Sequence, residues 1–137
     1  MRFRLSLILG LAALLAAATA RAGEASESAE SSQSPYFAVD PIPISIIRDG
    51  SGRGMLVVEI GIDAGTLDER KKAEEVMPRL TDLYIQVLNL YASRDLVLHH
   101  SPDAEVIKKR LQQATDEILG EKKGVVLLRQ LMVRRKG

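Results

Sequence analysis

The sequence predicts an α+β domain in which a small sheet packs on helices. Two strand-like segments flank a glycine-rich turn, which is typical of a β-hairpin. Apolar residues then recur at steps of three and four over Lys71–Asp95 and again over Ala104–Ile118, which predicts two amphipathic helices. A β-rich run, Val125–Val133, follows them. We therefore expect the order N-terminal hairpin, long helix, second helix and C-terminal strand.

Composition limits the possible functions. The 137 residues suffice for one domain with an appendage, and the absence of cysteine excludes a disulfide framework or a thiol nucleophile. Aromatic residues make up only 4% of the chain, which leaves little material for base stacking. The net charge of +1 conceals an acidic stretch, Gly23–Ser34, and a basic end, Glu121–Gly137. This pattern predicts local electrostatic contacts and no nucleic-acid binding.

Residues 1–22 have the three parts of a secretory signal peptide. Arg2 and Arg4 form a basic start, Leu5–Ala18 is apolar, and small-x-small cleavage patterns lie just after it. The alternative is a retained membrane anchor, although the apolar run is shorter than the about 20 residues that span a bilayer. In both cases we expect the rest of the chain to be exported. Residues 23–35 are small, polar and acidic, which predicts a flexible linker.

The folded domain is expected over residues 36–137, beginning at Tyr36. Asp40–Pro43 contains two prolines that lack an amide hydrogen, so it predicts an extended lead-in or an edge. Ile44–Arg48 predicts a strand, Asp49–Gly54 a flexible turn, and Met55–Ile62 a second strand with one apolar face. The turn lacks the Gly-Lys-Ser/Thr ending of a P-loop, so a hairpin loop is favoured over a phosphate cradle.

The long helical stretch contains Pro78, which has no amide hydrogen and clashes with the preceding turn of a helix. Two interpretations stay open: the main helix begins near Pro78 after a separate turn, or one helix is kinked there. Either Thr66 or Asp68 is expected to cap the start of this stretch. Its apolar face comprises Ala73, Val76, Met77, Leu80, Leu83, Tyr84, Val87, Leu88 and Tyr91.

The segments after this helix are predicted from local signals. Leu96–Leu98 is expected to be a short extended segment, and Ser101 is expected to cap a helix with Pro102 in its first position. Gly120 is expected to end that helix. The run Val125–Val133 is apolar on both faces, which predicts an interior strand or one at a subunit interface. Strict alternation groups Val125, Leu127, Leu131 and Val133 on one face, and Val126, Leu128 and Met132 on the other.

No residue pattern indicates catalysis, a cofactor or a metal. His99 and His100 are adjacent, cannot share a helical face, and have no cysteine to complete a zinc site. The carboxylate pairs lie on faces expected to be solvated, where burial does not tune a pKa. A binding or structural role is therefore expected in place of an enzyme. The basic end, Arg134–Lys136, is interpreted either as a guard of a strand edge or as a contact for anionic lipids or an acidic partner.

Several segments resemble the FliL family of flagellar basal-body-associated proteins. They are Tyr36-Phe37 with Pro41, Arg53 with Leu56–Glu59, the helical segment Met77-Pro78-Arg79-Leu80-Thr81-Asp82, and Asp95-Leu96, followed by the second helix and the last strand. Met77–Asp82 is the most specific of them. The short N-terminal apolar run and the lack of aromatics in Leu127–Gln130 indicate a divergent member.

The resemblance implies a protein that acts without catalysis or cofactor at the bacterial flagellum. It implies a periplasmic α+β domain, similar to the stomatin/prohibitin type, at or attached to the inner membrane. This domain would assemble into a homo-oligomeric ring and support the motor stator in motility and chemotaxis. Partners would be flagellar stator or basal-body proteins. The residues we expect to contact a partner are Arg79 and Asp82 in the long helix, and Arg134 and Arg135 at the basic end.

Overall fold

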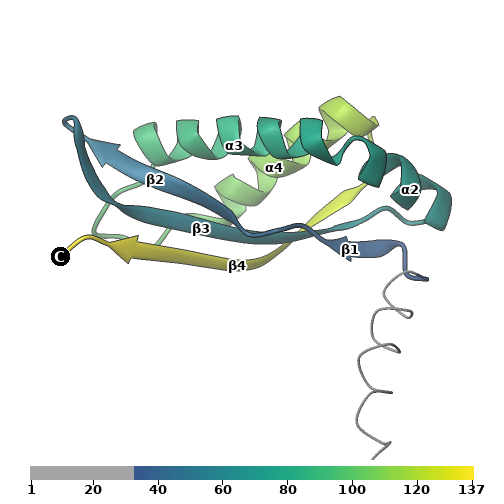
Figure 1. The fold of residues 1–137 in the computed structure, drawn as a ribbon, viewed down its shortest axis with the longest axis horizontal. Coiled ribbons are helices and arrows are strands. Elements are labelled where there is room, and N and C mark those ends of the chain that lie inside the picture. Colours follow the sequence, from purple (N-terminus) through teal and green to yellow (C-terminus); the bar gives the residue numbers. More distant parts are fainter. Residues whose placement is uncertain (1–32) are drawn as a thin grey trace, which may run out of the picture.

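The computed structural model describes residues 33–137, which form an antiparallel sheet with helices on one side (Figure 1). This confirms the predicted α+β class, in which a small sheet packs on helices. The signal peptide or anchor predicted for residues 1–22, and nearly all of the linker predicted for residues 23–35, lie outside the described residues. The elements are β1 (Tyr36–Ala38), β2 (Ile42–Arg48), β3 (Ser51–Asp63), α2 (Leu67–Glu75), α3 (Met77–Arg94), α4 (Ala104–Leu119) and β4 (Val125–Arg135).

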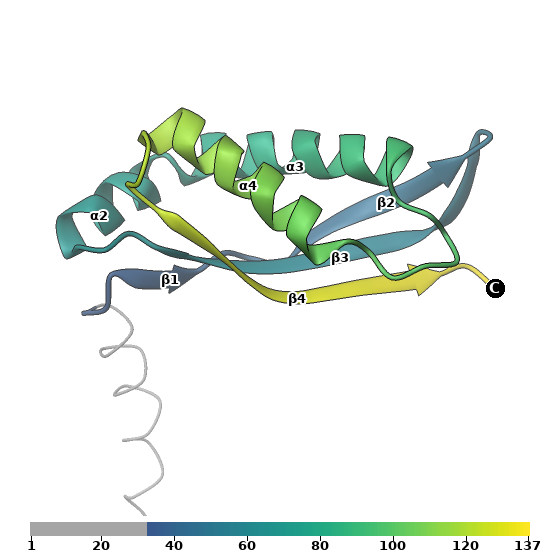
Figure 2. The same cartoon turned by 180° about the vertical axis from the view of Figure 1, so that it is seen from behind.

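The long strand β3 is the centre of the sheet. β1 and β2 pair with successive parts of one side of β3, and β4 pairs with its other side, all antiparallel. Helix α3 lies along β2, and α4 lies against α3 and β4. Figures 1 and 2 show that the helices cover the same face of the sheet and leave the opposite face bare.

The core lies between the sheet and the helices. β3 contributes every second residue from Leu56 to Ile62, as alternation predicts, and α3 contributes Leu80, Tyr84 and Leu88. Each large apolar side chain that is fully buried here stabilises the fold by about 1.5–3 kcal/mol. The predicted apolar and polar faces of the long helical stretch are therefore confirmed. The buried residues of α4 are Ile107, Leu111, Ala114 and Thr115.

The long helical stretch is broken two residues before Pro78. α2 ends at Glu75, Val76 has φ −101° and ψ 7°, and α3 begins at Met77. Pro78 is thus the second residue of a new helix, where an amide hydrogen would have no helical acceptor. The main helix thus begins near Pro78, as the first of the two interpretations predicts, but the nine-residue helix α2 precedes it in place of a separate turn. Of the two candidate caps, Thr66 is the one used, because its hydroxyl accepts the amide hydrogen of Glu69 at 3.2 Å.

The hairpin turn is shorter than predicted. Only Asp49 and Gly50 connect the strands, with φ values of 52° and 71°, and β3 already begins at Ser51. Positive φ at both central residues matches the right-handed twist of a tight hairpin, and Asp-Gly tolerates it best. The prediction of a flexible turn over Asp49–Gly54 was therefore wrong. The predicted edge is confirmed, since β2 includes Pro43 and lies at the side of the sheet.

Helix α4 begins later than predicted. The carboxylate of Asp103 accepts the amide hydrogens of Glu105 at 3.0 Å and Val106 at 3.1 Å, so Asp103 is the N-cap. The prediction of Ser101 as the cap was wrong, because a carboxylate placed two residues later satisfies two free amides at the positive helix end. Gly120 ends the helix with φ 95°, as expected. Residues 96–98 form a loop and not an extended part of the sheet.

Strand β4 lies at the edge of the sheet, which contradicts the first of its two predicted positions, an interior strand. The other, a strand at a subunit interface, stays a prediction. Its register shifts near Arg129: Gln130 pairs with Glu59, whereas Leu128 pairs with Ile60. This β-bulge adds one residue to β4 and exchanges the two faces of the strand beyond it. The predicted faces were therefore wrong. The residues directed toward the core are Val126, Leu128, Leu131 and Val133, and those on the bare face include Val125, Leu127 and Met132.

Candidate partner-binding groove

The described part of the chain offers no cluster suited to metal binding. No group of three or more His, Asp or Glu side chains that could hold a metal ion gathers within residues 33–137. The hydrogen bonds and charges of Lys123 and Lys72 lower the pKa of the partly exposed Glu69, and burial raises the pKa of Tyr84. Both groups have structural partners in this part of the chain.

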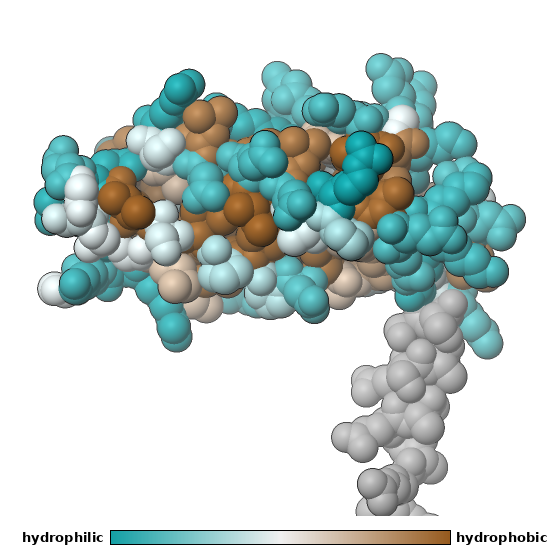
Figure 3. Space-filling view, turned by 45° about the horizontal axis from the view of Figure 1, so that its top comes forward, coloured by the Kyte–Doolittle hydropathy of each residue, from teal (hydrophilic) through white to brown (hydrophobic). Residues whose placement is uncertain are grey.

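An open groove of about 980 Å³ lies beside the sheet edge. β1, β2 and the segment between them form one wall, and α2 with the start of α3 forms the other. Apolar atoms dominate its surface. Figure 3 shows apolar patches along the α3 side of the molecule, separated by polar side chains. The apolar lining residues include Phe37, Val39, Ile42, Met77, Pro78 and Ile85.

The strand wall of the groove is poorly suited to binding a further β-strand. Pro41 and Pro43 lie on this wall and have no amide hydrogen to offer. A partner must therefore be recognised mainly through side chains. Three acidic residues, Asp40, Glu74 and Asp82, are exposed along the groove. Apolar walls with acidic residues on the rim suit an apolar segment that carries basic side chains.

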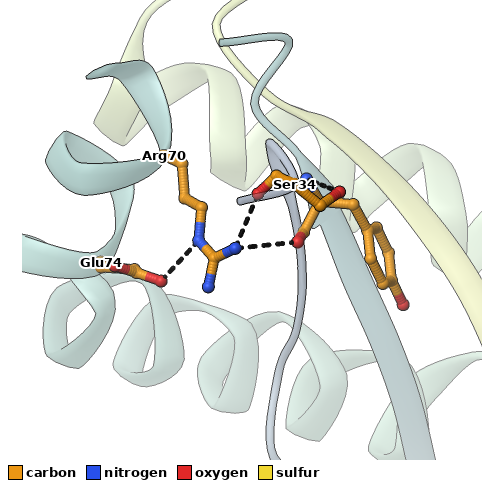
Figure 4. A network of polar contacts seen from close by, with 4 residues as sticks. Ser34, Arg70 and Glu74 are labelled. Atoms are coloured by element: carbon orange, nitrogen blue, oxygen red, sulfur yellow. Dashed lines mark hydrogen bonds and ion pairs between the residues drawn. The ribbon is translucent and has the colours of Figure 1, made fainter. Parts of the chain in front are cut away.

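One end of the groove is held together by Arg70 of α2 (Figure 4). Its Nη1 donates to the carbonyl oxygens of Ser34 at 2.6 Å and Tyr36 at 3.3 Å, and its Nε contacts Glu74 Oε1 at 2.8 Å. The same guanidinium lies 5.6 Å from the centre of the Phe37 ring. Arg70 thus fastens the beginning of the folded domain to α2. A half-buried arginine with several acceptors stabilises through charge-assisted hydrogen bonds.

The structure separates the four predicted contact residues into two pairs. Asp82 lines the groove, and Arg79 is exposed one turn earlier on α3 but lines none of the hollows described here. Arg134 and Arg135 end β4, which Figure 1 places by the hairpin tip, at the end of the molecule opposite α2. One binding surface therefore does not include all four. Sequence reasoning missed Arg70, since only the fold brings it to the backbone of Ser34.

The bare face of the sheet is a second apolar surface. Met55, Leu127 and Met132 are exposed on it, and Val57 between them is half-buried. Val57 pairs with both Pro43 and Met132, so apolar side chains cross all three strands at this level. Exposed apolar side chains on a sheet face are typical of contact surfaces. Glu59 and Gln130 pair between Val57 and Leu127, so polar side chains interrupt this apolar surface.

Comparison with known proteins identifies no family for this chain. Neither a scan against models of protein families nor a search of curated proteins finds a match for the chain. Within residues 33–137, none of the helices has both the length and the hydrophobicity needed to cross a membrane. The features that bear on function are the groove, the bare sheet face and the basic end of β4.

Proposed function

We propose that this protein is a non-catalytic component of the flagellar basal body, similar to FliL, that supports the motor stator in bacterial motility and chemotaxis. The observation that carries the proposal is the helix break at Val76. It directly precedes Met77–Asp82, the segment most similar to the FliL family, and this segment supplies Met77, Pro78 and Asp82 to the groove. The element order of the α+β domain also agrees with that resemblance.

The groove is the proposed contact with the stator or another basal-body protein. Its apolar walls would bury apolar side chains of the partner, and Asp40 and Asp82 would pair with basic residues beside them. This role needs no cofactor. It requires that the protein be exported, as the N-terminal 22 residues predict, and that it lie at or be attached to the inner membrane.

Assembly into a homo-oligomeric ring is part of the same proposal. The bare sheet face supports it, because Met55, Leu127 and Met132 expose apolar surface that a neighbouring copy would cover. A closed ring requires a heterologous contact, in which this face meets a different surface of the next copy.

The experiment is complementation of a deletion strain, with swimming measured in soft agar and under viscous load. We expect deletion to impair swimming and the wild-type chain to restore it. Asp82→Arg should fail to restore it, because it places a cation on the groove rim. Glu121→Arg is the matched control, since it makes the same charge change at an exposed residue that lines none of the hollows. Normal swimming of the deletion strain under load would contradict the proposal.

The alternative is a general periplasmic binding or scaffolding domain without a flagellar role. The groove itself favours this alternative equally, since its apolar walls and acidic rim are not specific to a motor protein. The alternative predicts that the gene lies away from flagellar genes and that non-motile cells make the protein. It also predicts normal swimming in the deletion strain.

A further inference from the structure

A second, smaller hollow lies at the hairpin end of the molecule and is strongly basic. Three segments distant in sequence form it: the hairpin tip, the loop between α3 and α4, and the end of β4. It has a volume of about 430 Å³. Four cationic side chains face one carboxylate, that of Asp49. The cationic residues are Arg48, Arg53, Arg135 and Lys136, and His99 lies beside them.

Backbone carbonyl groups, and not carboxylates, hold Arg48 and Arg135 in place. Arg48 Nη2 donates to the carbonyl oxygen of Leu96 at 2.8 Å, and Arg135 Nε donates to that of Leu98 at 2.6 Å. The amide of Lys136 donates to the carbonyl oxygen of Arg53 at 2.9 Å. None of the ion pairs found among residues 33–137 involves a cation of this hollow. The positive charge is thus positioned without being neutralised by the described residues.

A phosphate group is the ligand whose chemistry fits this arrangement. Guanidinium groups present a planar fork of N–H donors that matches phosphate oxygens, and Arg135 uses only its Nε in the bond to Leu98. Anchoring to carbonyl groups reduces the side-chain freedom that a ligand would otherwise have to remove. Lysine adds a mobile point charge beside the fork.

An apolar side chain next to a lining residue of the hollow indicates where that phosphate comes from. Val97 precedes Leu98, which lines the hollow, and Val97 is 53% exposed. Cations next to exposed apolar side chains are typical of proteins that bind at a membrane interface. We propose that the hollow binds the phosphates of anionic phospholipid headgroups, with Val97 inserted beside them.

The test measures binding of the full chain to vesicles of phosphatidylglycerol and of phosphatidylcholine by co-sedimentation. Comparison between variants in the same background cancels any contribution of the N-terminal apolar run. Arg53→Gln/Lys136→Gln should lower partition onto phosphatidylglycerol vesicles by about fivefold for each charge removed. These two side chains form no hydrogen bond or ion pair within residues 33–137, so the fold should persist.

The matched control is Lys108→Gln/Lys109→Gln, which removes two charges from the exposed side of α4. It should lower partition by less than about twofold, because neither residue lines the hollow. Val97→Ser should weaken vesicle binding several-fold. Equal losses in the two double variants, or no effect of Val97→Ser, would overturn the proposal. A third result would also overturn the proposal. In it, calorimetry shows that the wild type binds inorganic phosphate and that Arg53→Gln/Lys136→Gln does not, while the two proteins bind vesicles equally. These outcomes do not depend on the proposed motor role.

Discussion

The hydroxyl of Tyr84 lies 2.6 Å from the hydroxyl of Thr115, and both residues are fully buried between α3 and α4. The direction of this bond follows from the next one. Thr115 donates its single proton to the carbonyl oxygen of Leu111 at 2.8 Å, so Tyr84 must donate to Thr115. The two helices are thus joined by a polar link inside an apolar core.

This link predicts unequal effects for removing its two ends. Thr115→Val leaves the buried hydroxyl of Tyr84 without an acceptor, which should cost about 1–3 kcal/mol of unfolding free energy. Tyr84→Phe leaves Thr115 still bonded to Leu111, so it should cost only about 1 kcal/mol. Urea unfolding of the two single variants and the double variant measures this. A larger loss in Tyr84→Phe than in Thr115→Val would contradict the assigned direction.

The same tyrosine predicts how stability changes at alkaline pH. Burial raises the pKa of Tyr84 above its ordinary value of 10.0, so only the unfolded state loses this proton as the pH first passes that value. Its contribution is complete below pH 10.0 and declines as the pH rises further. Unfolding free energies measured between about pH 9 and 11 should fall more steeply for the wild type than for Tyr84→Phe. If the unfolding free energies of the wild type and Tyr84→Phe fell equally with pH, Tyr84 would not be responsible for the loss of stability.

The contacts of Arg70 predict that its hydrogen bonds to the backbone stabilise the fold more than its ion pair with Glu74 does. Arg70→Ala removes charge-assisted bonds to the backbone of Ser34 and Tyr36, and should cost about 1.5–3 kcal/mol. Glu74→Ala should cost less than about 1 kcal/mol, because the Glu74 side chain is exposed. Arg70→Lys keeps the charge but lacks the planar fork, so it should restore stability only in part. Urea unfolding gives these values. Equal losses of stability for Arg70→Ala and Glu74→Ala would show that the bonds of Arg70 to the backbone do not fasten the beginning of the domain to α2.

The ring of Tyr36 packs over Gly61 on the bare face of the sheet. A Cβ atom at Gly61 would lie only 2.3 Å from Cε2 of that ring, so Gly61→Ala should destabilise the protein by about 1–3 kcal/mol. Combining it with Tyr36→Ala should remove the clash. In thermal unfolding, the double variant should therefore lose less stability than the sum of the losses in the two single variants. Strict additivity would mean that β1 does not pack here as described.

Much of the fold follows from local patterns in the sequence. The alternation of β3 and the three-and-four spacing of α3 set the buried faces, and the missing amide of Pro78 locates the helix break. The errors arise where one residue changes the local geometry. The bulge at Arg129 exchanges the faces of β4, and Asp103 replaces Ser101 as the cap of α4. Neither feature changes the apolar pattern, so periodicity cannot reveal it.

The candidate sites were harder to predict, because they depend on contacts between distant segments. The groove joins residues near Phe37 to residues near Asp82, and the basic hollow joins Arg48 to Arg135. Sequence reasoning selected Asp82 and Arg135 from their own neighbourhoods. It had no means to find Arg48 or Arg70, whose roles appear only when the chain is folded.

The central claim is that the groove contacts the flagellar stator, and crosslinking in cells tests it most directly. A photoreactive residue would replace Ile85, which is exposed on the groove wall, in swimming cells. The same residue at Glu121 is the control. We expect a stator subunit in the adduct from position 85 and none from position 121. Adducts from position 85 that contain no flagellar protein, in cells whose swimming requires this chain, would contradict the claim.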